Sequence, residues 1–171
     1  MQGFKVSVAE ILGQPGHYRD ISVSEPIPEV GNALAHVTDA PLQGRLRAEA
    51  VVEGVLVTGT VTATIEAECA RCLTPVSDEI SVELCELFVA PGHDLPDEED
   101  AYEVEGFDID LEPMLRDALA LDIPLRPVCR ADCKGLCARC GKDLNEGACS
   151  CEESEMDPRW AALSEMRDKL G

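Results

Sequence analysis

The sequence predicts an α+β fold in which an antiparallel β-sheet or partial barrel is followed by helices and a cysteine-rich module. Residues 55–69 alternate between apolar and polar side chains, which is the period of a strand with one buried face. A helical pattern follows Asp110, and six cysteines then fall between residues 129 and 151. We therefore expect three parts: an antiparallel β domain at 1–90, an acidic loop and helix at 91–127, and the cysteine-rich module with a C-terminal helix at 128–171.

The chain before residue 54 predicts little regular structure. Residues 4–12 mix strand and short-helix signals. Residues 13–41 contain four prolines, and because proline has no N–H group to donate, we expect a mostly irregular segment with one short strand near Tyr18–Val23. Residues 42–53 predict a strand that ends at a turn near Gly54.

Two long strands are predicted next, at 55–69 and 76–89, joined by the segment CARCLTP. Cys69 and Cys72 then lie at the tip of a hairpin, where turn backbone lets two sulfurs converge on one metal ion. Cys85 stands alone on the second of these strands, and we interpret it as a small, buried or half-buried apolar residue.

An acidic segment separates the strands from a helix. Residues 93–112 carry ten acidic and no basic side chains, and clustered like charge with proline and glycine predicts a loop over 91–106. Asp110 can cap a helix whose first turn tolerates Pro113, and Pro124 ends it. The predicted apolar face of this helix consists of Leu111, Leu115, Ala118 and Leu119.

A second helix is predicted at the C-terminal end of the chain. Asp157 is its N-cap and Pro158 occupies its first position. The stripe at helical spacing consists of Trp160, Leu163, Met166 or Arg167, and Leu170. We interpret this helix as one that docks on its own domain, with a partner-binding helix as the alternative.

The cysteines predict a metal site. Zinc is held by four soft donors in a tetrahedron, and two cysteines a few residues apart supply half of that set from one turn. The candidate ligands are Cys69, Cys72, Cys129, Cys133, Cys137, Cys140, Cys149 and Cys151. The tight pairs predict one or two Zn²⁺ ions in a zinc-ribbon-like module.

The eight cysteines can be divided between metal sites in two ways. The preferred one forms a local site from Cys137, Cys140, Cys149 and Cys151, and a second site from Cys69, Cys72, Cys129 and Cys133. The rival division forms one local site from Cys129, Cys133, Cys137 and Cys140 and leaves the others unused. Spacing alone does not choose between them.

Other uses of the cysteines are weaker interpretations. An iron–sulfur cluster also takes cysteine ligands, but the C-x2-C-x2-C-x3-C run is absent. The C-x2-C pair at Cys69 lacks the strand–helix context of a thioredoxin-like redox motif. A hydrolytic zinc keeps an open position and usually takes histidine or carboxylate ligands, whereas these are all thiols. Because the sequence also has no P-loop, Rossmann, GxSxG or HExxH motif, we expect no enzyme.

Charge and composition restrict the location and the partners. The net charge is −20, which repels phosphate backbones and attracts basic proteins. The N-terminal segment has neither the basic start nor the apolar run of a signal peptide or membrane span. We therefore expect a cytoplasmic protein without membrane contact, in a reducing environment where clustered cysteines bind metal rather than form disulfides.

Several motifs occur in an order that resembles the YceD family of large ribosomal RNA subunit accumulation proteins. They are E-C-x-R-C-L from Glu68, D-L-x-P-x-L-R-D-A-L-x-L-x-x-P from Asp110, C-x3-C-K-G-L-C-x2-C-G-x-D-L-N from Cys129, a final C-x-C, and D-P-R-W-A-A-L from Asp157. The likeness spans about residues 66–168. It implies a bacterial-type cytoplasmic protein that normal accumulation of large-subunit ribosomal RNA requires. It brings no catalytic residue and implies structural or metal-binding roles for Cys69, Cys72 and the C-terminal cysteines.

The acidic charge and the ribosomal resemblance together predict how such a protein would act. One route is binding of a basic large-subunit ribosomal protein or pre-ribosomal particle through the acidic loop. The other is direct RNA contact through the cysteine-rich module, where Arg130, Lys134, Arg139 and Lys142 gather. The charge favours the first route. The alternatives are a zinc-ribbon nucleic-acid-binding regulator and a redox-sensing zinc protein.

Overall fold

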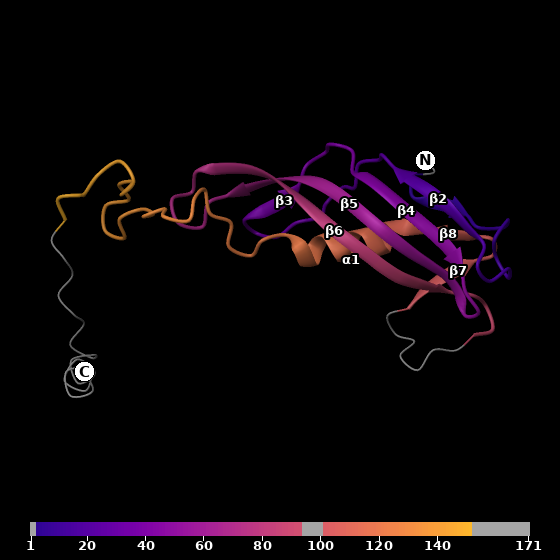
Figure 1. Ribbon diagram of the computed structural model, residues 1–171. Helices are drawn as coiled ribbons and strands as arrows, with labels where there is room; N and C mark the ends of the chain where they lie inside the picture. Colours follow the sequence, from indigo (N-terminus) through magenta and orange to yellow (C-terminus); the bar gives the residue numbers. More distant parts are fainter. Residues whose placement is uncertain (1–2, 94–100, 152–171) are drawn as a thin grey trace, which may run out of the picture. The chain divides into compact units, whose positions relative to one another are not determined.

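The computed structural model describes residues 3–93 and 101–151 (Figure 1). The chain divides into two compact units, residues 1–133 and 134–171, and each is described by itself. Cys129 and Cys133 belong to the first unit, whereas the sequence pattern grouped them with the module at 128–171. The reason is that their thiols lie at the tip of the β-sheet. The predicted helix that begins at Asp157 lies outside the described residues.

The described part of the first unit is a curled sheet with one helix (Figure 1). The elements are β1 (Lys5–Ser7), β2 (Tyr18–Val23), β3 (Ala35–Val37), β4 (Gln43–Ala50), β5 (Gly54–Glu68), β6 (Pro75–Val89), β7 (Tyr102–Glu105), β8 (Asp108–Asp110) and α1 (Leu111–Asp122). The strand order is β1-β8-β7-β6-β5-β4-β2, and β3 pairs with β5 beyond β4. The short strands β1, β3, β7 and β8 were not predicted.

The sheet is mixed rather than antiparallel, which corrects the predicted fold class. All neighbouring strands run antiparallel except β6 and β7, which pair in parallel at Phe88–Tyr102 and Val89–Glu103. A parallel neighbour needs a crossover of about a dozen residues, and residues 90–101 provide that length. A crossover connection and a loop have similar amino-acid compositions. The composition of the acidic segment therefore did not indicate that it contains β7.

The acidic segment itself holds β7, so the predicted loop over 91–106 is wrong at Tyr102–Glu105. Val104 is buried, whereas Glu103 and Glu105 are exposed. Tyr102 stacks on Phe88 with ring centroids 5.4 Å apart. The alternation is thus present in the sequence, but it spans only four residues among many carboxylates, too few for the period to be recognised.

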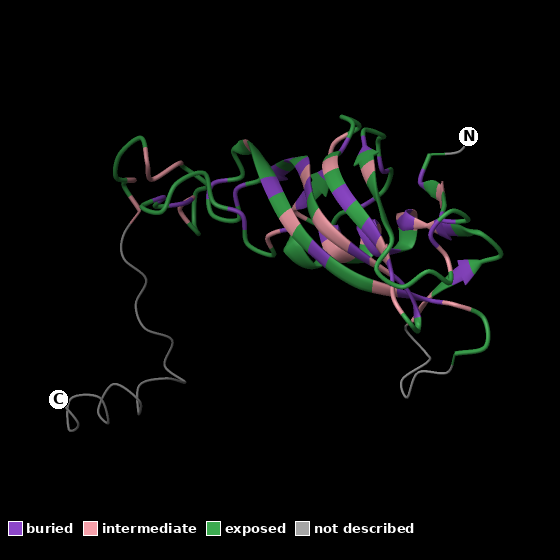
Figure 2. Cartoon of the chain, turned by 45° about the vertical axis from the view of Figure 1, so that its right-hand side comes forward, coloured by how far each residue is buried: buried purple, intermediate pink, exposed green. Residues whose placement is uncertain are grey.

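The long hairpin of β5 and β6 confirms the predicted alternation. Its fifteen pairs keep one register from Gly54–Val89 to Glu68–Pro75. One face carries the buried side chains of Val57, Val61 and Ile65, and the other is largely exposed, so buried and exposed bands alternate along the ribbons (Figure 2). Cys85 lies on the exposed face, which corrects its predicted burial: its position in the alternation matches Glu83 and Ser81, not Leu84.

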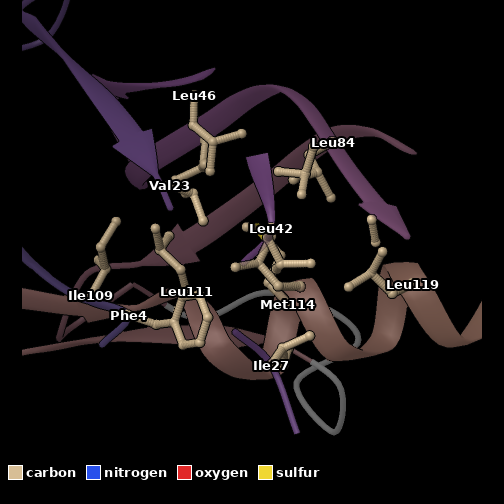
Figure 3. Close-up of a cluster of buried hydrophobic side chains, with 14 of the residues drawn as sticks. Phe4, Val23, Ile27, Leu42, Leu46, Leu84, Ile109, Leu111, Met114 and Leu119 are labelled. Atoms are coloured by element: carbon tan, nitrogen blue, oxygen red, sulfur yellow. The ribbon is translucent and has the colours of Figure 1, made fainter. Parts of the chain in front are cut away.

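Helix α1 begins and ends as the sequence predicts. The Asp110 side chain accepts a hydrogen bond from the Glu112 N–H at 3.0 Å, which satisfies one free amide of the first turn. The helix ends at Asp122, just before Pro124. Its buried side chains are Leu111, Met114, Leu115 and Leu119, which pack against the sheet in one hydrophobic core (Figure 3). Only this one helix follows the sheet within the described residues, fewer than the predicted fold class implied.

Among the described residues, no helix combines the length and the apolar content that crossing a membrane requires.

Candidate metal centres

The first centre begins at the tip of the β5–β6 hairpin. Cys69 follows the last residue of β5, and its N–H donates to the Thr74 carbonyl at 2.9 Å. The Leu73 N–H donates back to the Cys69 carbonyl at 2.9 Å, with Leu73 at a φ of 60°. This tight turn brings Cys69 and Cys72 to the same side of the hairpin tip.

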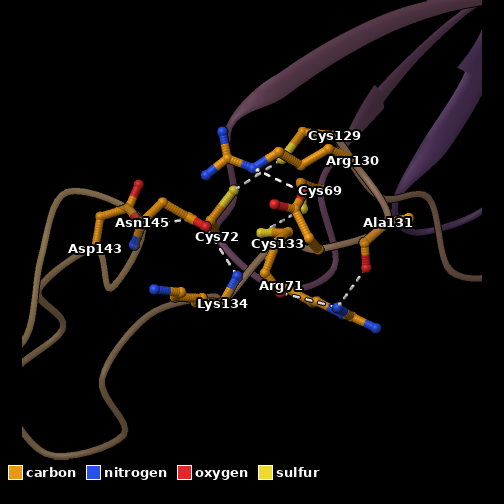
Figure 4. A network of polar contacts seen from close by, with 11 residues as sticks. Cys69, Arg71, Cys72, Cys129, Arg130, Ala131, Cys133, Lys134, Asp143 and Asn145 are labelled. Carbon is orange, nitrogen blue, oxygen red and sulfur yellow. Dashed lines mark hydrogen bonds and ion pairs between the residues drawn. The ribbon is translucent and has the colours of Figure 1, made fainter.

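The segment that leaves α1 supplies the other two thiols. The Ala70 N–H donates to the Pro127 carbonyl at 2.8 Å. The Arg71 guanidinium donates to the carbonyls of Ala131 at 3.3 Å and Cys133 at 2.8 Å. Main-chain groups from segments about sixty residues apart are therefore held together beside the sulfurs (Figure 4).

The sulfur geometry of this centre fits a tetrahedral metal. The Sγ atoms of Cys69, Cys72, Cys129 and Cys133 all lie within 4.8 Å of one another. Cys69 Sγ lies 3.9 Å from Cys133 Sγ, and Cys72 Sγ lies 3.6 Å from Cys129 Sγ. Four sulfurs at about 2.3 Å from zinc are about 3.8 Å apart along each edge of the tetrahedron, whereas a disulfide needs about 2.05 Å. The sulfur–sulfur distances therefore match those around a metal ion and not those of disulfide bonds.

The electrostatics of the first centre favour a bound cation. N–H groups of the main chain, first that of Cys129 and then those of Cys72 and Arg71, lower the pKa of Cys69 to about 6. Desolvation of its sulfur within the cluster, followed by hydrogen bonds with the other thiols, raises the pKa of Cys129 to about 12. One thiolate forms readily, but four thiolates this close repel one another without a positive ion.

The second centre lies in the second unit and is built by one loop. The Cys137 N–H donates to the Lys142 carbonyl at 2.8 Å, and the Gly141 N–H donates to the Cys137 carbonyl at 2.9 Å. Gly141 has a φ of 71°, a conformation that favours glycine. The turn places Cys140 beside Cys137 and leaves their sulfurs on the same side.

The thiols of Cys149 and Cys151 complete the second group. All four Sγ atoms lie within 4.8 Å of one another, and Cys149 Sγ lies 3.4 Å from Cys137 Sγ. N–H groups of the main chain, first that of Cys140 and then that of Arg139, lower the pKa of Cys137 to about 6. A hydrogen bond with Cys140, followed by desolvation, raises the pKa of Cys151 to about 12. The same split of pKa values thus occurs in both groups.

Polar contacts fix the loop that carries the second centre. The Asn145 side-chain oxygen accepts from the Lys134 N–H at 2.8 Å. The Lys142 ammonium donates to the Ala148 carbonyl at 2.9 Å, and the Leu144 N–H donates to the Gly135 carbonyl at 2.9 Å. The cysteines of this group are half-buried or exposed, unlike Cys69 and Cys133 in the first. Because less of this centre is buried, its folded conformation depends more on metal binding.

The eight cysteines fall into the two groups of the preferred division, and the rival grouping of Cys129 and Cys133 with Cys137 and Cys140 is not formed. Cys85 belongs to neither group. Each group offers four thiols, and a tetrahedral ion bound by all four would keep no position for a water molecule, which is the arrangement of a structural zinc site. The contacts of Arg71 were not predicted, and the one signal for them in the sequence is its place between the two cysteines of CARC.

Comparisons with known proteins agree with the motifs. Residues 57–167 match the family model described as "Large ribosomal RNA subunit accumulation protein YceD". The chain is 48% identical over 166 residues to an uncharacterized protein of Mycobacterium tuberculosis, covering 94% of this chain and 80% of that protein. It is 27% identical over 128 residues to YlbN of Bacillus subtilis, covering 74% of each chain.

A plant protein carries the functional description. The Arabidopsis thaliana protein named large ribosomal RNA subunit accumulation protein YCED homolog 1, chloroplastic, is 33% identical over 63 residues, covering 37% of this chain and 20% of that protein. No solved structure matches the chain. The family match covers well over half of the chain and includes all eight clustered cysteines, so this chain belongs to the YceD family.

Proposed function

We propose that this chain is a non-enzymatic factor for the accumulation of large-subunit ribosomal RNA, and that it acts by binding a basic ribosomal protein or an assembly particle that contains one. The family description supports the process. The single observation that carries the choice of partner is the net charge of −20. A surface of that charge repels RNA and increases the encounter rate with basic chains.

The distribution of the carboxylates supports the same choice. The exposed face and edge of β6 carry Asp78, Glu79, Glu83 and Glu86, and this strand contains no basic residue. A non-enzymatic role is consistent with the two thiol groups, because a metal that has four cysteine ligands keeps no position for substrate. The metal would then give order to the hairpin tip and to the second unit.

Affinity purification from growing cells tests the proposal at two salt concentrations. We expect basic large-subunit proteins or pre-subunit particles in the eluate at low salt, and less of them at high salt because the attraction is screened. Recovery of RNA after the basic proteins have been removed would contradict the proposed partner. Normal levels of large-subunit RNA in cells without the chain would contradict the process.

Direct RNA contact through the second unit is a second candidate. The side chains of Lys134, Arg139 and Lys142 are exposed there, and they surround a cysteine loop of zinc-ribbon size. Replacing all three with glutamine should abolish RNA retention if this unit binds RNA, and should leave capture of basic proteins unchanged if the first proposal holds.

A further inference from the structure

Within the part of the chain that the structure describes, most of one edge of strand β6 is unpaired. On one side it pairs with β5 along its whole length. On the other side it pairs with β7 only at Phe88 and Val89. The edge from Pro75 to Leu87 therefore has no neighbouring strand among the described residues. An open edge of this length presents a row of main-chain donors and acceptors.

The register shows which residues direct their main-chain groups to this edge. The Cys69 N–H donates to the Thr74 carbonyl, which continues the β5–β6 register by one more pair. Hydrogen-bonded and non-hydrogen-bonded pairs alternate in an antiparallel ladder. The odd-numbered residues of β6, among them Ser81, Glu83 and Cys85, therefore direct N–H and C=O away from β5. The Glu79 N–H donates to the Asp78 carboxylate at 2.9 Å, whereas the edge-facing main-chain groups of Ser81, Glu83 and Cys85 make no hydrogen bond to other described residues.

A groove of about 330 Å³ runs between this edge and α1. Its apolar floor includes Val82 and Leu84 of β6 and Met114 and Ala118 of α1. Met114 is buried, whereas Leu121 on the rim is 89% exposed. A strand edge beside a helix with an apolar floor is the geometry in which several domain families bind an extended peptide as an added strand.

All charged residues that line the groove are acidic. Four carboxylates line it, those of Glu83, Glu86, Asp117 and Asp122, and none of its ten lining residues is basic. Asp117 accepts a hydrogen bond from the Tyr102 hydroxyl at 2.9 Å, and the other three form no ion pair with any residue that the structure describes. A second copy of this chain would bring the same sign of charge to the edge, which opposes pairing between copies. A basic chain would neutralise it.

We propose that the groove between β6 and α1 binds a lysine- or arginine-rich segment of a partner protein in extended conformation, paired with β6 as an additional strand. This proposal rests on the proposed function and identifies its binding surface. The main-chain ladder provides affinity that does not depend on the partner's side chains. The carboxylates select for basic residues, and side chains that alternate toward α1 contact the apolar floor.

Binding of a short peptide of alternating lysine and valine tests the charge selection, with a glutamate–valine peptide as its counterpart. We expect the basic peptide to bind and the acidic one not to bind. The double variant Glu83→Lys/Asp122→Lys should weaken binding by about tenfold or more. The charge-matched control Glu10→Lys/Glu53→Lys, on exposed positions outside the groove, should change it by less than about threefold. Equal losses of affinity in both variants would show that binding depends only on the net charge, and would contradict the groove as the binding site.

Main-chain pairing has its own test, in which Cys85→Pro is compared with Cys85→Ala. Both remove the thiol, but only proline removes the edge-facing N–H, and proline is tolerated on a free strand edge. After thermal melting shows that both fold, peptide affinity should be lower for Cys85→Pro. Amide exchange at Ser81, Glu83 and Cys85 should slow when the peptide binds. Unchanged exchange at all three amides, or association of the protein with itself through this edge, would overturn strand addition.

The same variants separate this inference from the proposed function. Suppose that the Glu83→Lys/Asp122→Lys chain captures large-subunit proteins from cells as well as the unmodified chain does. The groove is then not the binding surface, but the proposed function is unaffected. If the unmodified chain captures no basic protein at all, the proposed partner is wrong whatever the peptide does.

Discussion

Arg71 and Cys133 are joined by a hydrogen bond from the guanidinium to the Cys133 carbonyl at 2.8 Å, across 62 positions of sequence. Arg71 lies between two thiols of the hairpin tip, and Cys133 provides a third thiol of the same group. The arginine therefore holds the backbone of one candidate ligand, Cys133, from the turn that carries two of the others, Cys69 and Cys72. Such contacts orient a metal site without touching the metal.

Arg71→Ala should weaken the first centre. Two carbonyls lose a charged donor, and we expect a loss of about 1 kcal/mol in the free energy of unfolding of the first unit, with faster zinc release to a chelator. Arg126→Ala serves as the control, because it removes an exposed arginine of the same unit whose side chain has no partner among residues 3–93 and 101–151. Chelator competition and urea unfolding measure both effects. Equal behaviour of the two variants would mean that Arg71 does not position the ligands.

The protein purified under reducing conditions should contain two zinc ions per chain, because each group has four thiols within ligand distance. Elemental analysis of Cys133→Ser should show one ion fewer, and its thermal midpoint should decrease. Cys85→Ser should retain both ions and change stability by less than about 0.5 kcal/mol, since Cys85 is exposed and outside both groups. A full zinc content in Cys133→Ser would exclude it as a ligand.

The metal-free protein should gain stability as pH increases from 6 to 9. Folding lowers the pKa of Cys69 from its ordinary value near 9 to about 6. A lowered pKa contributes stability that is fully present above the unfolded value and is lost as pH decreases through the folded one. Urea unfolding in the presence of chelator should therefore show a steeper pH dependence in the unmodified chain than in Cys69→Ser. Parallel curves would mean that this thiolate is not stabilised by folding.

Gly59→Ala should destabilise the sheet. Gly59 lies inside β5 at a φ of 146°, and a Cβ there would come within 2.3 Å of the Arg45 carbonyl oxygen. The close approach of β4 to β5 at this point thus requires glycine, and we expect a loss of about 1–3 kcal/mol in unfolding free energy. Gly3→Ala adds a Cβ into open space and should change little. Equal thermal midpoints for the two variants would contradict the steric reason.

Local patterns in the sequence determined the long hairpin, the cap and end of α1, and the spacing of the cysteine pairs. Each depends on interactions within a few residues: period-two burial from Val55 to Cys69, the Asp110 cap, and turns that hold two sulfurs each. The short strands could not be predicted in this way, because β7 consists of four residues whose partner, Phe88, comes from another strand.

Tertiary structure alone decided which cysteine pairs meet. Both divisions satisfy the same spacing, and the choice depends on where the chain after α1 returns. The hydrogen bonds from Ala70 and Arg71 bring that return to the hairpin tip, so Cys129 and Cys133 join Cys69 and Cys72. Pairing across some sixty residues is a property of the packed core and the sheet curvature, and no local pattern in the chain encodes it.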